Sequence, residues 1–316
     1  MRALAIDIGG TKLGAALVTG LGEIACSQRV PTPATDDPEV VFDALTAAVD
    51  DVLHAGGIDP DQTGELPGVG VATAGPLDAR AGTVSPVNIG AWRGFPLRER
   101  LTERYGLPVR MFGDAVSVAV AEHWRGAARG RPNVLGMVVS TGVGGGLILG
   151  DTVVPGTTGN AGHIGHVSVD PDGPDCTCGG TGCLEAIASG TAIGAWTAER
   201  TADRTEPLRT AATAAQAAWA GDPVALAAFR RAGEAIGMAV AGAVTLLDLD
   251  VVVIGGGVAA AGAVLFEPIA DGYARYAALE FAALPRVVPA ALGGDAGLVG
   301  AAAVVLQPQS YWPHRD

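Results

Sequence analysis

The first hydrophobic positions of the chain predict a β-hairpin. Residues 4–8 and 13–18 are apolar runs, and a polar, glycine-bearing turn at 9–12 separates them. Two strand-forming runs joined by such a turn are typical of a hairpin. Residues 137–149 repeat the order of strand, glycine-rich turn and strand. The sequence therefore predicts two lobes, each with its own hairpin.

Between and after these hairpins the pattern alternates between helical and strand-like. Residues 38–54 carry apolar positions at helical spacing, 69–71 resemble a buried strand, and 116–124 continue as a helix. The segment 211–247 is Ala-rich and predicts mostly helix, and the apolar strand 251–254 runs straight into three glycines. This alternation predicts an α/β protein.

Composition narrows the class of protein. A length of 316 residues exceeds one typical domain of roughly 100–200 residues, which agrees with two lobes. No apolar run approaches the roughly 20 residues that a membrane span needs. The formal net charge of -13 disfavours nucleic acid as a partner, because binding to its phosphates depends on clustered Lys and Arg. An acid after only four apolar residues, without a signal-peptide cleavage pattern, predicts a cytoplasmic protein.

The turns of both predicted hairpins have the groups that a phosphate site needs. Free backbone N–H groups in a glycine turn can bind phosphate oxygens, a hydroxyl and an ammonium group add to them, and an acid at the strand end can face Mg²⁺. A Gly-Gly turn alone is also compatible with a purely structural hairpin. The combination predicts ATP and Mg²⁺ at Asp7, Gly9, Gly10, Thr11 and Lys12, with Thr141 and Gly142 in the second turn.

A third glycine turn follows the predicted strand 251–254. Gly255, Gly256 and Gly257 are expected to contact the adenosine, because a strand that enters a glycine-rich turn is a common nucleotide-site arrangement. The same residues match a loose dinucleotide fingerprint, with Glu280 a little beyond the distance of its acidic residue. That alternative leaves the two hairpin turns without a function.

Three of the four cysteines lie within eight residues of one another, downstream of a histidine. His166, Cys176, Cys178 and Cys183 offer one imidazole and three thiolates, which is the number of ligands in a closed, structural zinc site. The alternative is a set of reduced thiols in a glycine-rich loop. We expect the zinc to order this loop and to take no part in the chemistry, since a catalytic zinc keeps one position open.

Asp114 follows the strand-like residues 108–112 and begins a predicted helix. A residue at a strand end can face a cleft, but Asp is also frequent as a helix N-cap. The local sequence leaves both interpretations open.

Taken together, these motifs resemble the ROK family (repressors, open reading frames, kinases). The resemblance spans nearly the whole chain, and it rests on 7–12, 86–97, 114–115, 141–146 and 165–185. It implies an ATP-dependent sugar kinase that forms a homodimer, with the two-lobed actin-like ATPase (ribonuclease H-like) fold and a central cleft. The expected lobes are 1–114 with 297–316, and 115–296.

The resemblance also implies roles for individual residues. Asp114 would be the base that accepts the proton of the sugar 6-hydroxyl. Asn88, His166 and Glu185 would contact the sugar hydroxyls.

Two positions depart from the family pattern near the expected sugar. Gly113 stands where the family usually has Asn, and His163 stands where it usually has Glu, although the family's N-acetylmannosamine kinases can also carry His there. The sequence therefore leaves three alternatives: a kinase for a glucose-type, amino or N-acetylamino hexose, an N-acetylmannosamine-specific kinase, and a catalytically weak sugar-sensing regulator.

Overall fold

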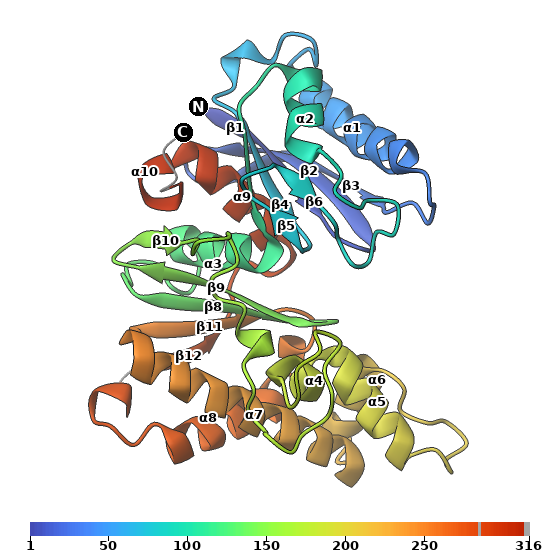
Figure 1. Ribbon diagram of the computed structural model, residues 1–316, viewed down its shortest axis with the longest axis vertical. Coiled ribbons are helices and arrows are strands. Elements are labelled where there is room, and N and C mark those ends of the chain that lie inside the picture. Colours follow the sequence, from blue (N-terminus) through green and yellow to red (C-terminus); the bar gives the residue numbers. More distant parts are fainter. Residues whose placement is uncertain (284–285, 313–316) are drawn as a thin grey trace. The chain divides into compact units, whose positions relative to one another are not determined.

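The computed structural model describes residues 1–283 and 286–312. The chain divides into two compact units (Figure 1). The first comprises Met1–Gly130, Gly146–Ala161 and the residues from Leu292 onward, and the second comprises Arg131–Gly145 and Gly162–Ala291. The helix that follows Gly113 thus lies in the first unit, and the lobe boundaries expected from the resemblance stay a prediction.

A five-stranded sheet of order β3-β2-β1-β4-β7 forms the centre of the first unit. Strands β1 (Arg2–Ile8) and β2 (Lys12–Thr19) pair antiparallel as the predicted hairpin, and β3 (Ile24–Pro31) extends it. Strands β4 (Val69–Thr73) and β7 (Val109–Gly113) continue the sheet in parallel with β1.

The two faces of this sheet have different helices. The side chains of Leu4, Ile6 and Ile8 belong to the core cluster that includes the buried residues of α1 (Pro38–Ala55). Because side chains alternate along a strand, Asp7 points to the opposite face. There it lies against α9 (Ala296–Leu306), which packs on α3 (Asp114–Arg125) (Figure 1).

The segment between β4 and β7 contains β5 (Leu77–Asp78), β6 (Thr83–Val84) and α2 (Leu97–Tyr105). The fully buried indole of Trp92 stacks on Phe95 at 4.5 Å between ring centroids, and its N–H donates to the carbonyl of Pro38 at 3.1 Å. This anchor holds the loop that carries Asn88.

The second sheet has the order β10-β9-β8-β11-β12. The second of the two predicted hairpins lies in this sheet and consists of β8 (Val134–Val139) and β9 (Val143–Leu149). Strand β10 (Thr152–Val154) pairs with β9. Strand β11 (Val251–Gly255) runs parallel to both β8 and β12 (Arg286–Pro289).

The helices of the second unit are α4 (Leu184–Ala188), α5 (Gly190–Arg200), α6 (Ala211–Trp219), α7 (Pro223–Leu247) and α8 (Ala263–Tyr276). Near the C-terminus, α10 (Pro308–Tyr311) follows α9 in the first unit. None of the helices in the described parts of the chain is long and apolar enough to cross a membrane.

The Ala-rich segment 211–247 is mostly helical, as predicted, and it forms two helices, α6 and α7. Gly221 has a φ of +85°, a left-handed conformation that a helix interior does not accept. Asp222 then caps α7 by accepting hydrogen bonds from the N–H groups of Val224 and Ala225, and Pro223 occupies the first turn. The break separates α6 from α7 and allows each to pack independently.

Candidate functional site

The first phosphate turn closes on itself and on the loop that contains Asn88. The N–H of Gly9 donates to the carbonyl of Lys12 at 3.0 Å, and the hydroxyl of Thr32 donates to the carbonyl of Gly9 at 2.7 Å. A Cβ atom on Gly10 would clash with the side chain of Asn88. The structure therefore brings a predicted phosphate-turn residue and a predicted sugar-contacting residue together.

Asp7 lies near the end of β1, and Asp114 directly follows β7, the parallel strand on the other side of β4. Strand register pairs Ile8 with Thr73 and Thr73 with Gly113, so β1, β4 and β7 end at one edge of the sheet. Burial, and to a smaller extent the charge of Asp114, raises the pKa of Asp7 to about 6, whereas Lys12 opposes the shift. Two acids at one sheet edge, one half-buried and one exposed, fit a divalent cation that would relieve their repulsion.

Asp114 is the first residue of α3 and does not act as its N-cap. Gly113 occupies the cap position with extended backbone and provides no side chain. The carboxylate of Asp114 is exposed and accepts a hydrogen bond from the N–H of Ala115 at 2.7 Å. The presence of Asp at position 114 is therefore not explained by an N-cap role.

Gly113 leaves room for a side chain. A Cβ atom there would meet only Cδ2 of Leu77, at 3.9 Å, which is an ordinary van der Waals contact. Its backbone, with φ at -60° and ψ at 149°, suits any residue. The backbone at position 113 would thus accept the Asn that is usual in the family, and it does not require glycine.

The second glycine turn is fixed by hydrogen bonds within the second unit. The N–H of Ser140 donates to the carbonyl of Gly142 at 2.8 Å, and the hydroxyl of Thr191 donates to the carbonyl of Thr141 at 2.9 Å. The N–H of Gly190, where α5 begins, donates to the carbonyl of Ser140 at 2.7 Å. The start of α5 is therefore attached directly to this turn.

Glu185 connects the second turn to the cysteine cluster. Its Oε2 accepts a hydrogen bond from the N–H of Val143 at 2.8 Å. A Cβ atom on Gly142 would lie 2.5 Å from the same oxygen, so only glycine leaves the carboxylate in place. Glu185 stands on α4, whose N-cap is Cys183.

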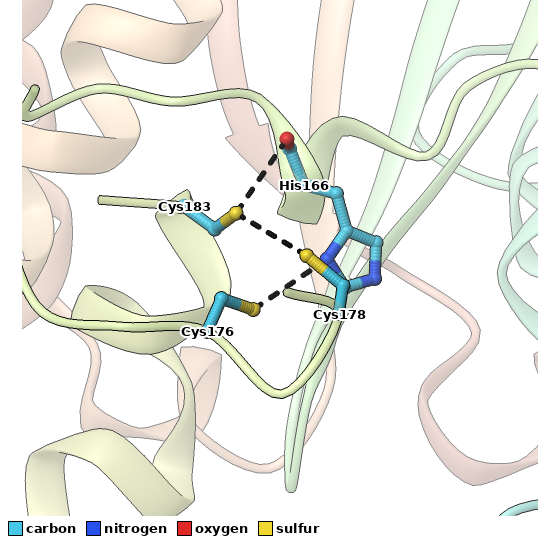
Figure 2. A group of neighbouring side chains, drawn as sticks. All are labelled: His166, Cys176, Cys178 and Cys183. Atoms are coloured by element: carbon cyan, nitrogen blue, oxygen red, sulfur yellow. Dashed lines mark hydrogen bonds between the residues drawn. The ribbon is translucent and has the colours of Figure 1, made fainter. Parts of the chain in front are cut away.

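The predicted ligands His166, Cys176, Cys178 and Cys183 converge (Figure 2), with all four ligand atoms within 4.8 Å of one another. The sulfur atoms of Cys178 and Cys183 are 3.7 Å apart, and the Cys176 sulfur lies 3.8 Å from Nδ1 of His166. Ligands about 2.3 Å from a tetrahedral zinc lie about 3.8 Å apart. The donor set and its spacing therefore fit a closed zinc site.

Burial also affects the protonation of one thiol in this cluster. Burial raises the pKa of the Cys183 thiol to about 12, so without a metal this group stays protonated near neutral pH. The exposed ring of His163 lies beside that of the ligand His166, with 6.2 Å between centroids. The predicted sugar-contacting His163 is thus positioned by the same loop that carries the predicted metal ligand His166.

The third glycine turn borders a cavity of about 780 Å³ in the second unit. Gly256 has a φ of +95°, and a Cβ atom there would clash with the carbonyl of Val139, so the turn requires glycine. Thr141 and Gly257 line the cavity, whereas Gly255 and Gly142 are not among its lining residues.

Helices α5 and α6 supply cavity residues that the sequence did not single out. They are Thr191, Gly194, Gln216 and Trp219, with Arg209 in the preceding loop. The sequence feature that could have indicated this cavity is Trp219, a single large aromatic residue at the end of an Ala-rich run.

Two α/β units, each with a five-stranded mixed sheet that includes a hairpin with a glycine turn, define the two-lobed actin-like ATPase fold. The family model described as "ROK family" matches residues 3–308. The chain belongs to the ROK family.

Named relatives are similar over nearly their whole lengths. A glucokinase of Halalkalibacterium halodurans is 35% identical, and the match covers 96% of this chain and 95% of that protein. An N-acetylmannosamine kinase of Escherichia coli O7:K1 is 37% identical, with 97% and 99% covered. The crystal structure of an ROK glucokinase from Streptomyces griseus in complex with glucose and AMPPNP has a TM-score of 0.82 at 34% identity, with 97% and 100% covered.

Proposed function

We propose that this chain transfers the γ-phosphate of ATP to the 6-hydroxyl of a hexose, with Asp114 as the base. The chain is an ATP-dependent sugar kinase, as its family and the extent of its similarity to sugar kinases show. We propose in addition the position of transfer, the base and the class of sugar.

The observation that carries the proposal is the pair of acids at the edge of the first sheet. Asp7 follows the buried part of β1 and lies beside the phosphate turn, where a magnesium ion bound to ATP would neutralise its charge. Asp114 is exposed at the start of α3, where a sugar hydroxyl can reach it. One acid is therefore suited to the metal ion and the other to accepting a proton, which needs no raised pKa when the proton leaves late.

We assign the remaining sites as follows. The nucleotide phosphates contact the turns at Gly9–Lys12 and Thr141–Gly142, and the adenosine occupies the cavity beside Gly257. Zinc holds the loop of His163 and His166 and the start of α4, so that Glu185 and both imidazoles can contact the sugar. Zinc provides charge and rigidity in this arrangement and takes part in no bond-breaking step.

The sugar is a hexose of the glucose type or an amino or N-acetylamino hexose. His163 favours N-acetylmannosamine as the second candidate, because that class of ROK kinase can carry His at this position. Gly113 disfavours it, because those kinases keep the Asn that this chain lacks. The expected homodimer stays a prediction.

The test is ADP release measured against glucose, mannose, glucosamine, kanosamine, N-acetylglucosamine and N-acetylmannosamine. Asp114→Asn should lower kcat by at least about 1,000-fold with the best sugar and leave the Kd for ADP unchanged, because the phosphate turns are intact. Asp43→Asn, which changes an exposed acid of α1, is the matched control. Near-normal turnover of Asp114→Asn would refute the mechanism, and sugar binding without ADP release from any sugar would favour the sugar-sensing regulator.

A further inference from the structure

One face of α6 lines the cavity of the second unit. Ala212, Ala215, Gln216 and Trp219 recur at spacings of three and four residues, which places their side chains on one side of a helix. The two alanines keep this wall thin, and Trp219 alone adds a large flat surface. Its side chain is exposed to the extent of 60%, unusual for the largest side chain in a protein.

Trp219 is held in place although it is exposed. Its indole N–H donates to the carbonyl of Ala261 at 3.0 Å. Ala261 ends the short helix Ala259–Ala261, which follows directly on the glycine turn that borders the cavity. The ring is therefore fixed relative to that turn before any ligand arrives, which lowers the entropy that binding must overcome.

The other lining residues suit a flat and weakly polar group. Arg209 is the single charged side chain among the described residues that line the cavity, and no carboxylate is present among them. Ser140, Thr141 and Gly257 supply small polar and backbone groups to the lining. A volume of about 780 Å³ lies within the range of sites that enclose whole cofactors.

We propose that Trp219 is the base-stacking residue of the phosphoryl donor site, and that it makes this enzyme depend on a purine nucleoside triphosphate in preference to base-free polyphosphate. This inference rests on the assignment of the adenosine to this cavity in the proposed function. A purine offers the larger face to the indole, whereas polyphosphate offers none. The stacking contribution therefore belongs to the base and is independent of the phosphate turns.

The experiment compares Trp219→Leu and Trp219→Phe with the wild-type protein by calorimetric titration with ADP, GDP, CDP and tripolyphosphate. Trp219→Leu should raise the Kd for ADP about 5- to 30-fold and narrow the difference between ADP and CDP, since base stacking on an aromatic side chain has this magnitude. Trp219→Phe should stay within about 3-fold of wild type, because it keeps an aromatic face. The Kd for tripolyphosphate should be the same in all three proteins.

Trp196→Leu is the matched control, because Trp196 stacks on Arg200 at 3.9 Å on α5 and does not line the cavity. Equal ADP and CDP affinities in the wild type, or an unchanged Kd for ADP in Trp219→Leu, would overturn the inference. So would phosphorylation from polyphosphate as efficient as from ATP. These titrations need no sugar, so base-dependent ADP binding in a protein that phosphorylates no sugar would refute the proposed function alone.

Discussion

The carboxylate of Glu185 accepts a hydrogen bond from the backbone N–H of Val143, at 2.8 Å. The two residues belong to different predicted motifs, the start of the helix after the cysteine cluster and the second glycine turn. Cys183 is the N-cap of that helix. The first turn of the helix and the hydrogen bond of Glu185 would therefore connect an ion bound by the cluster directly to a phosphate bound by the turn.

Replacement of Gly142 by Ala should disturb the site through Glu185. The new Cβ atom would lie 2.5 Å from Oε2, and the carboxylate must move to avoid it. We expect the KM for sugar to rise about 10-fold or more, in line with the loss of a well-placed hydrogen bond to a charged group. Steady-state kinetics with both substrates measures this.

Gly242→Ala is the matched control for that variant. Gly242 lies in α7, where a Cβ atom would meet nothing within 4 Å. This change should leave both KM values unchanged and stabilise the protein by about 0.4–1 kcal/mol. An unchanged sugar KM in Gly142→Ala would show that Glu185 has no part in sugar binding.

Cys178→Ser should release the zinc. The Cys178 sulfur is one of four ligand atoms, and a serine hydroxyl is a poor substitute for a thiolate. We expect the bound zinc to fall from about one ion per chain to less than about 0.2, together with a lower Tm and a higher sugar KM. Atomic absorption, thermal unfolding and kinetics provide the three measurements.

Cys26→Ser is the control, because Cys26 lies outside the cluster and its thiol donates only to the carbonyl of Val52. It should retain zinc and sugar affinity. A fully active Cys178→Ser protein without zinc would show that the metal is incidental to the sugar site.

The half-buried carboxylate of Asp7 should make stability depend on pH. Its pKa in the folded protein is about 6, above the ordinary 3.8, so the fold favours the protonated form. This contribution is fully present below about pH 4 and is lost as the pH rises through about 6, up to about 3 kcal/mol. Asp7→Asn, which is neutral at every pH, should therefore raise the Tm by several degrees at pH 7.5 and change it little at pH 4.

The same substitution should remove activity, because Asn cannot neutralise a magnesium ion as a carboxylate does. Thermal unfolding is to be measured without nucleotide or Mg²⁺, and adding both should stabilise the wild type more than the variant. Equal Tm values for the two proteins across this pH range would contradict the assigned burial of Asp7.

Gly113→Asn should shift the preference among sugars towards glucose. The backbone accepts the new side chain, and the nearest atom to a Cβ there is 3.9 Å away. An added hydrogen-bonding group beside the base should lower the KM for glucose about 5- to 10-fold relative to that for the best wild-type sugar, since one new hydrogen bond is worth about 1 kcal/mol. The ADP-release assay with the same six sugars measures the ratio of the two KM values.

Gly64→Asn is a suitable comparison, because a Cβ atom there meets nothing within 4 Å and the residue lies far along the chain from the site motifs. It should leave the ratio unchanged. If Gly113→Asn behaves in the same way, position 113 does not determine the sugar.

Local signals in the sequence determined most of the secondary structure. Both hairpins and α1 formed as predicted, because apolar periodicity and glycine turns act over a few residues. The four side chains of the candidate metal site also lie within 18 residues of one another, so their spacing alone predicted the cluster that Figure 2 shows. The break at 220–222 was also encoded locally by Gly-Asp-Pro, but the surrounding alanines obscured it.

Only the tertiary structure decided which of these motifs meet. Asp7 acquires its raised pKa from burial beneath α9 and from Asp114, which is more than one hundred residues away and reaches it through the strand order β1-β4-β7. Trp219 is anchored by Ala261 for the same kind of reason, because α6 and the turn after β11 come together only when the second unit packs. Contacts of this kind depend on strand order and on helix packing, and no local pattern of residues specifies them.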